Sequence, residues 1–127
     1  MSKKVLVVDD EQSVVKVVVF RIRKAGYEVV SANDGESALK VLKDYKPDLI
    51  LLDIALPDID GYEVSRRIRL DESTKSIPII FFSASTAMIM DKSEVLNKYG
   101  VQGYISKPFE TKELLQSISN IIGDSFV

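Results

Sequence analysis

Cysteine, histidine and tryptophan are all absent from this chain of 127 residues. Without cysteine, the chain has no disulfide framework, no thiol nucleophile and no thiolate zinc site. Without histidine, it has no Ser-His-Asp triad, no phosphohistidine and no imidazole metal ligand. Any chemistry must therefore use carboxylates, lysines and hydroxyl groups.

An excess of positive charge and long apolar runs are also lacking. Lys and Arg number 17 against 19 Asp and Glu, a net charge of −2. This balance lacks the positive field of general nucleic-acid binders, so we expect no direct nucleic-acid partner. The longest apolar runs, such as residues 49–52 and 79–82, fall far short of the roughly 18 residues of a membrane helix. The basic start is not followed by a signal-peptide core. We therefore expect no membrane insertion and a cytoplasmic location.

Short apolar runs alternate with longer segments of helical period, which is typical of βα units. The expected strands are residues 5–8, 28–31, 49–52, 79–82 and 103–105. The unbroken apolar character of the first, third and fourth runs predicts parallel strands buried on both faces, and the other two are expected nearer the sheet edges. The fold class is therefore α/β with a doubly wound parallel sheet, in a single domain over residues 1–127 with a core at about 3–122.

Capping residues mark several helices between these strands. Asn33 stands three residues before Glu36, and Asp60 three residues before Glu63, so both are predicted as N-caps. Gly123 is predicted to end the last helix. Further helices are expected at residues 14–22, within 85–100 and at 114–122.

Polar residues interrupt the apolar pattern where the predicted strands end. Asp9 and Asp10 follow the first strand, Asp53 ends the third, Ser83 ends the fourth and Lys107 follows the fifth. Each alone is compatible with a helix cap, a turn or a surface charge. Because the carboxyl ends of parallel strands meet at one edge, where ligands bind, the five together predict a site.

Three carboxylates in one place repel each other unless a cation neutralises them. Mg²⁺ prefers oxygen ligands, which the three aspartates supply without His or Cys. Three negative charges, the two positive charges of the metal and the one of Lys107 sum to zero, which leaves room for a phosphoryl group. Asp53 is the best-placed nucleophile because an apolar strand fixes it, and its attack gives an acyl phosphate.

Several motifs then occur in order along the chain. They are Val5-Leu6-Val7-Val8-Asp9-Asp10-Glu11, Pro47-Asp48-Leu49-Ile50-Leu51-Leu52-Asp53, Leu56-Pro57 with Asp60-Gly61, Pro78-Ile79-Ile80-Phe81-Phe82-Ser83-Ala84 and Gly103-Tyr104-Ile105-Ser106-Lys107-Pro108-Phe109. With this spacing the chain resembles, over about residues 3–122, the receiver domain of two-component response regulators. The resemblance implies a five-stranded, flavodoxin-like fold with strand order 2-1-3-4-5.

The same resemblance implies a role for each residue at the predicted metal site. Asp53 would be the phosphoacceptor. Asp10 and Asp53 would hold Mg²⁺ together with the backbone carbonyl of Ala55, and Asp9 would act mainly through a metal-bound water.

The resemblance also implies a phosphate-binding set of Ser83, Ala84 and Lys107. The peptide bond from Lys107 to Pro108 would be cis. Tyr104 would be a switch aromatic that moves when Ser83 approaches the phosphoryl group, although an edge-strand tyrosine kept for packing fits the sequence too. Ser85 is a rival for the switch hydroxyl. Asp58, where the family often has glycine, is interpreted as loop variation.

The function implied is a switch that transfers a phosphoryl group to itself and slowly loses it, rather than a turnover enzyme. A sensor histidine kinase or a histidine phosphotransfer protein would be the donor, and another protein would read the changed surface. We expect the chain to act alone unless it is a piece of a longer regulator.

Three alternatives compete with this function. The first is a receiver-like module that works without phosphorylation. The second is a phosphohydrolase that turns over through a phosphoaspartate, although the haloacid-dehalogenase type needs a second aspartate where Ala55 stands. The third is a flavodoxin-like cofactor carrier, but the acids of the first loop disfavour a bound phosphate.

Overall fold

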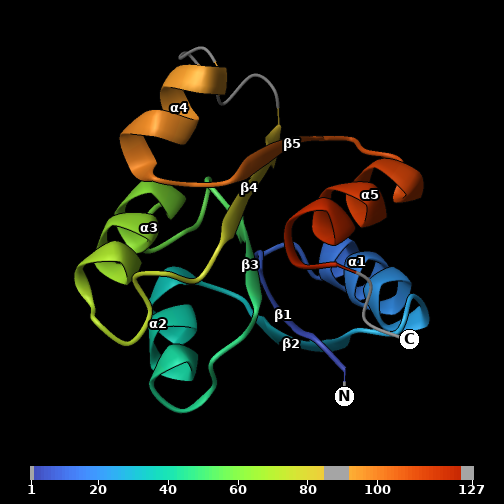
Figure 1. Ribbon diagram of the computed structural model, residues 1–127, viewed down its shortest axis with the longest axis horizontal. Helices are drawn as coiled ribbons and strands as arrows, with labels where there is room; N and C mark the ends of the chain where they lie inside the picture. The colour runs from blue at the N-terminus through green and yellow to red at the C-terminus, as the bar shows by residue number, and fades with distance from the viewer. Residues whose placement is uncertain (1, 85–91, 124–127) are drawn as a thin grey trace.

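The computed structural model describes residues 2–84 and 92–123, which form one parallel sheet with helices on both sides (Figure 1). The strands are β1 (Lys4–Val8), β2 (Glu28–Ala32), β3 (Leu49–Asp53), β4 (Ile79–Ala84) and β5 (Gly103–Lys107). The helices are α1 (Gln12–Lys24), α2 (Gly35–Asp44), α3 (Gly61–Leu70), α4 (Lys92–Tyr99) and α5 (Thr111–Ile122).

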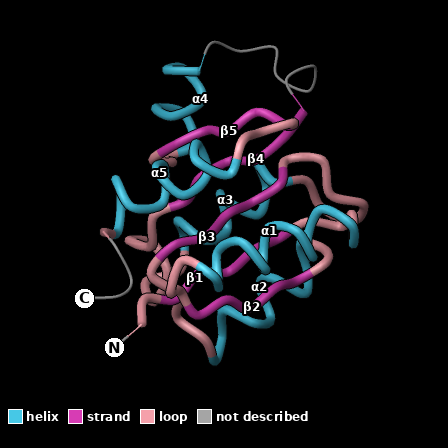
Figure 2. Tube along the Cα trace, turned by 90° about the vertical axis from the view of Figure 1, so that its right-hand side faces the viewer, coloured by secondary structure: helices cyan, strands magenta, loops and turns pink. Residues whose placement is uncertain are grey.

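The strand order is β2-β1-β3-β4-β5, and every neighbouring pair is parallel. Figure 2 shows the strands stacked from β5 at the top to β2 at the bottom. The predicted doubly wound α/β fold and its strand order 2-1-3-4-5 are confirmed. The second and fifth strands lie at the two edges, as their shorter apolar runs predicted.

Side chains of the central strands alternate between two apolar clusters. In β3, Leu49 and Leu51 pack into the cluster covered by α1 and α5. Ile50 and Leu52 pack into the cluster covered by α2, α3 and α4. Figure 1 shows the same division, with α1 and α5 on one side of the sheet and the other three helices opposite. Because successive side chains point to opposite faces, a strand covered on both sides must be apolar throughout, which explains its unbroken apolar run.

The N-cap predictions are half confirmed. The Asp60 side chain accepts a hydrogen bond from the Glu63 backbone N–H at 2.9 Å, as expected for the start of α3. The prediction for α2 is wrong by one residue, because Asp34 rather than Asn33 is its N-cap. Asp34 accepts the Ser37 N–H at 2.7 Å, so α2 begins one residue later than the Asn33 pattern indicated.

The bounds of the remaining helices differ in part from the predicted ranges. α1 is longer than the predicted 14–22, and α5 ends at Ile122 before Gly123, whose φ of 80° suits a residue without a Cβ. The helix expected within 85–100 is found as α4 over its described part. Within the described residues, no helix combines the length and the apolar character that crossing a bilayer demands.

Candidate phosphoacceptor site

The polar residues singled out in the sequence meet at the carboxyl edge of the sheet. Asp9 and Asp10 directly follow β1, and Asp53 is the last residue of β3, the neighbour of β1 in the middle of the sheet. Lys107 is the last residue of β5 rather than the one after it, and β4 continues one residue past Ser83. The strand order reverses between β1 and β3, which is where ligands bind in open α/β sheets.

Asp9, Asp10 and Asp53 form one carboxylate cluster. One oxygen atom from each side chain lies within 4.8 Å of the corresponding atoms of the other two. Asp9 and Asp53 are buried, at 0% and 3% exposure, whereas Asp10 is exposed. The buried pair therefore needs a positive partner, while Asp10 faces solvent at the mouth of the cluster.

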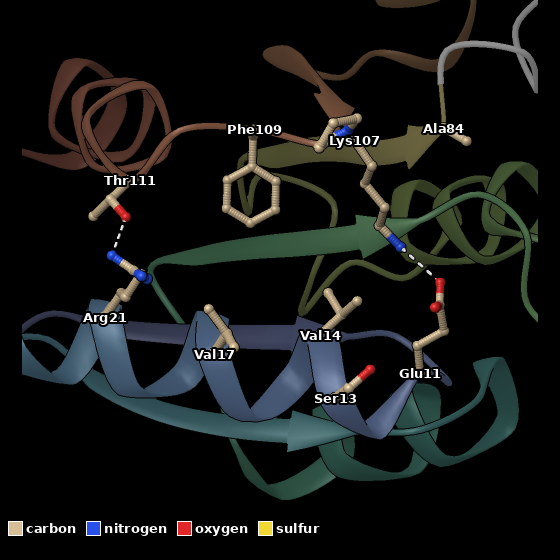
Figure 3. Close-up of a pocket in the computed structure, with 10 residues that line it drawn as sticks. Glu11, Ser13, Val14, Val17, Arg21, Ala84, Lys107, Phe109 and Thr111 are labelled. Atoms are coloured by element: carbon tan, nitrogen blue, oxygen red, sulfur yellow. Dashed lines mark hydrogen bonds and ion pairs between the residues drawn. The ribbon is translucent and has the colours of Figure 1, made fainter.

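Lys107 supplies positive charge to this cluster. Its Nζ donates to Asp9 Oδ2 at 2.7 Å and to Asp53 Oδ2 at 3.4 Å. It also lies 3.7 Å from Glu11 Oε1, the ion pair drawn in Figure 3, and 4.7 Å from the centre of the Phe82 ring. One ammonium group thus pairs with two buried aspartates and the exposed Glu11, and Asp10 adds a further carboxylate, so the cluster keeps an excess of negative charge.

Burial and this excess of negative charge both affect the pKa of the phosphoacceptor candidate, Asp53. Burial, followed by the charge of Asp9, raises the pKa of Asp53 from 3.8 to about 6, although Lys107 and the Ala55 N–H act in the opposite direction. For Lys107, burial disfavours the charged form. The hydrogen bond and charge of Asp9, with the charge of Asp53, outweigh it and raise the pKa of Lys107. At neutral pH the Asp53 carboxyl is therefore mostly ionised and becomes protonated as the pH falls toward about 6, its raised pKa, whereas the raised pKa of Lys107 keeps its ammonium group charged.

Backbone contacts fix the orientation of the two buried acids. Asp9 Oδ1 accepts the Glu11 N–H at 2.9 Å, and Asp53 Oδ1 accepts the Ala55 N–H at 3.1 Å. Each acid thus uses one oxygen for its own loop and offers the other to Lys107. This division restricts the side-chain rotamers without occupying every acceptor position of the carboxylates.

The predicted switch residues lie on the other face of the sheet from Lys107. Tyr104 belongs to the cluster under α2, α3 and α4, and it is buried at 8% exposure. Ser83 is 1% exposed and follows Phe81 of the same cluster by two residues, so alternation places it on that face too. Phe81 is in register with Tyr104, which brings the predicted pair onto neighbouring strands. Ser85, the rival hydroxyl, lies outside the described residues.

Ala84 and Lys107 are in register on β4 and β5, and both line a groove beside the carboxylates. This groove has a volume of about 520 Å³ and runs between α1 and the segment after β5. Figure 3 shows Val14 and Val17 on one wall and Phe109 on the other. The site is therefore approached over a largely apolar surface. The peptide bond from Lys107 to Pro108 is cis, as expected.

Residues 5–119 match the family described as response regulator receiver domain. The chain belongs to this family. It is a receiver domain of the kind used in two-component and phosphorelay signalling. The family assignment agrees with the resemblance found in the sequence, and neither the strand order nor the acid cluster of the structure departs from it.

Relatives with known names are similar over nearly the whole chain. The alkaline phosphatase synthesis transcriptional regulatory protein PhoP of Bacillus subtilis is 38% identical over 123 residues, which are 96% of this chain and 49% of PhoP. The chain therefore spans about half the length of that relative. The chemotaxis protein CheY4 of Vibrio cholerae has a TM-score of 0.87 at 30% identity, with 95% of this chain and 99% of CheY4 covered.

A third relative carries a metal. The receiver domain of the sensor histidine kinase PA1611 from Pseudomonas aeruginosa has a TM-score of 0.85 at 31% identity, covering 98% of this chain and all of that one, and holds a magnesium ion in its active-site cleft.

Sequence reasoning missed two residues near the site. Glu11 was assigned no role, yet it lies 3.7 Å from Lys107. Asp58, interpreted as loop variation, accepts hydrogen bonds from the Gly35 and Glu36 N–H groups at 2.9 and 2.8 Å. Nothing in the sequence pairs Asp58 with residues 22 and 23 positions earlier, so only the fold identifies this contact.

Proposed function

We propose that this receiver domain accepts a phosphoryl group on Asp53 and thereby changes its protein-binding surface. The observation that carries the proposal is the position of Asp53. It is a buried carboxylate at the end of a central strand, with two further carboxylates and the Lys107 ammonium group beside it. A fixed carboxylate of this kind is a suitable nucleophile for phosphorus.

Asp9, Asp10 and Asp53 have the chemistry expected of a magnesium site. All the ligand atoms they offer are carboxylate oxygens, their spacing allows a shared cation, and their charge exceeds that of Lys107. We assign Asp10 and Asp53 as direct ligands, with the Ala55 carbonyl beside them and Asp9 acting through a water. When bound, Mg²⁺ would neutralise these carboxylates and the oxygens of the transferred group.

In the proposed transfer, an oxygen of Asp53 forms a bond to phosphorus while the bond from phosphorus to the donor's histidine nitrogen breaks. The released imidazole takes up a proton from solvent. Lys107 exchanges part of its contact with Asp53 for a phosphoryl oxygen, and the Ser83 hydroxyl and the Ala84 N–H bind the other oxygens. Later attack by water breaks the bond to Asp53 and releases inorganic phosphate, so the domain is a self-acting switch with slow loss of its label.

The proposed partners follow from the two faces of the site. A sensor histidine kinase or a histidine phosphotransfer protein would reach Asp53 over the groove between α1 and the segment after β5, since Lys107 and Ala84 line it. On the other face, movement of Ser83 toward phosphate would alter the packing around Tyr104 and the surface of α4, β5 and α5, which a second protein would read. A cytoplasmic location, where kinase and Mg²⁺ are present, fits this chemistry.

Labelling with a small acyl phosphate tests the proposal. The protein is incubated with acetyl phosphate and MgCl₂, and intact mass spectrometry follows the added phosphoryl group. We expect one label on the wild type and on Asp44→Asn, an exposed control at the end of α2, and none on Asp53→Asn. A label that persists on Asp53→Asn contradicts the assignment, and sustained release of phosphate from small esters would favour a phosphohydrolase instead.

A further inference from the structure

Asp58 lies in the loop between β3 and α3, the same loop that contains Ala55. Its two carboxylate oxygens reach α2, where Oδ1 accepts the Gly35 N–H at 2.9 Å and Oδ2 accepts the Glu36 N–H at 2.8 Å. These are the first two residues of the helix, whose N–H groups have no partner inside it. The helix thus receives part of its cap from a distant loop.

The helix has an N-cap of its own as well. Asp34 accepts the N–H of Ser37, the third residue of α2. The two aspartates therefore share the start of α2 without competing for the same N–H group. Both favour the helix in the same way, but only Asp58 connects it to the loop after Asp53.

Packing at Gly35 brings the same loop and helix into close contact. A Cβ atom on Gly35 would lie 2.4 Å from Cγ1 of Ile59 and 2.8 Å from Cγ2 of Val64. Only a residue without a side chain allows this approach. Asp58 and Ile59 therefore hold the loop against α2 by two neighbouring contacts, one polar and one apolar.

The loop is also held at its other side, next to the phosphoacceptor. The Gly61 N–H donates to the Ile54 carbonyl at 2.7 Å, and the Ala55 N–H donates to Asp53 Oδ1 at 3.1 Å. A Cβ on Gly61 would lie 2.4 Å from the Asp53 carbonyl oxygen. Ala55 thus lies in a segment fixed by Asp53 and Ile54 at its start and by α2 further along.

We infer that Asp58 is a positioning residue, which ties the loop after β3 to α2 and so holds Ala55 and the Asp53 side chain in place for the metal and the phosphoryl group. The inference rests on the proposed function, because it concerns the same site. A ligand held by a supporting hydrogen bond binds a metal more tightly than one that must be ordered on binding. Without Asp58, the loop would keep the apolar contact of Ile59 at Gly35 but lose both of these hydrogen bonds to the start of α2.

Two alanine variants separate this role from a general effect on stability. Asp58→Ala and Asp34→Ala each remove one carboxylate from the start of α2, so we expect similar losses in thermal stability. Only Asp58→Ala should loosen the loop. Its Mg²⁺ dissociation constant, measured by NMR titration of backbone amides with MgCl₂, should rise roughly tenfold. In the metal-free protein, hydrogen exchange of the Gly61 and Leu56 amides should accelerate in Asp58→Ala and stay unchanged in Asp34→Ala.

A third variant distinguishes position from charge. Asp58→Asn removes the negative charge but keeps one oxygen acceptor for an N–H of α2, so its Mg²⁺ affinity should lie closer to that of the wild type than to that of Asp58→Ala. Equal weakening by Asn and Ala would show a purely electrostatic effect and overturn the inference. Equal weakening by Asp34→Ala and Asp58→Ala would overturn it too, since the effect would then come from α2.

The wild type separates this inference from the proposed function. If the wild type neither binds Mg²⁺ nor takes a label from acetyl phosphate, the proposed function is wrong. If it does both and Asp58→Ala matches it in Mg²⁺ affinity and in hydrogen exchange, only the role of Asp58 is wrong.

Discussion

Two clusters of charged side chains in this molecule have opposite effects on their carboxylates. At the carboxyl edge of the sheet, Asp53 lies beside Asp9 and Lys107, and its pKa is raised to about 6. On the surface of α3, Glu63 lies between Arg66 and Arg67, and hydrogen bonds from these two, Arg66 first, lower its pKa to about 2. Both acids have a cation within 3.5 Å.

Burial and charge balance explain the difference. The Lys107 side chain is 15% exposed and the Asp53 side chain 4%, and the single ammonium group faces several acids. Arg66 and Arg67 are 60% and 41% exposed, both lie close to Glu63, and Arg67 also lies 3.3 Å from the exposed Glu36, so the charges of this cluster balance. Water screens the surface cluster, so it contributes little to stability. The buried cluster holds an unbalanced negative charge, and this is the property that makes it suitable for a metal and for phosphate chemistry.

Among variants of these two clusters, we expect Asp53→Asn to change the free energy of unfolding most. A carboxyl whose pKa is raised on folding stabilises the protein fully below pH 3.8, and this contribution is lost as the pH rises through about 6. The difference corresponds to roughly 3 kcal/mol at neutral pH. In EDTA, urea unfolding at pH 7.5 should therefore show the variant to be more stable than the wild type, with the gap closing toward pH 4. A variant that is less stable at pH 7.5 would contradict the unbalanced charge.

Lys107→Ala should act in the opposite direction. It leaves the fully buried Asp9 without its ion-pair partner, and because water reaches the partly exposed Lys107 side, the metal-free protein should lose about 2 kcal/mol of unfolding free energy. MgCl₂ should restore part of this loss because a cation can compensate the same carboxylates. The exposed Lys112→Ala is the matched control and should change stability little. Equal stability of the two lysine variants in EDTA would mean that the ion pair between Lys107 and Asp9 does not contribute to the stability of the fold.

Two arginines of α3 allow the contrast to be tested on one helix. Arg69 is partly buried, which lowers its pKa, and it donates to the carbonyls of Gly100 at 2.8 Å and Ile77 at 2.7 Å. Arg69→Ala leaves these acceptors without their donor and should cost about 2 kcal/mol, measured by urea unfolding. Arg66→Ala removes only an exposed ion pair, and its loss should be several times smaller. Similar losses for both would show that burial is not the deciding factor.

The smallest effect should come from Glu63→Gln. A carboxyl with a lowered pKa stabilises the protein above pH 4.5, and the contribution is lost as the pH falls toward about 2. Because the cluster is at the surface, thermal unfolding at pH 7 should shift by much less than for the Asp53, Lys107 and Arg69 variants, and added salt should remove the difference. A large shift that does not depend on salt would show that solvent screens the Glu63 cluster no more than the buried cluster around Asp53, which would contradict the contrast.

Most of the fold could be predicted from the sequence because the strands are buried on both faces. The apolar run ending at Asp53 can only be a covered strand, and the following acid then falls at the sheet edge. The N-cap of α2 was misplaced because Asn33 and Asp34 are both good caps, and only the hydrogen bond from Ser37 decides between them. Local chemistry thus located the helix to within one residue.

The sequence predicted which residues gather at the site, but not which contacts they make with each other. Asp9, Asp53 and Lys107 could be gathered from the strand ends, since parallel strands share an edge. That Lys107 lies closer to Asp9 than to Asp53, that Glu11 joins them, and that Asp58 reaches Gly35 depend on loop paths. Tertiary packing determines the paths of the loops, and a local sequence pattern does not predict it.

The most direct test of the central claim is the titration of the Asp53 side-chain carboxyl carbon by ¹³C NMR, without metal and with saturating MgCl₂. The buried, unbalanced cluster predicts a midpoint near pH 6 in EDTA and a marked fall in the midpoint when Mg²⁺ is present. A midpoint near 3.8 in EDTA that MgCl₂ leaves unchanged would contradict both the charge excess at Asp53 and its place in a metal site.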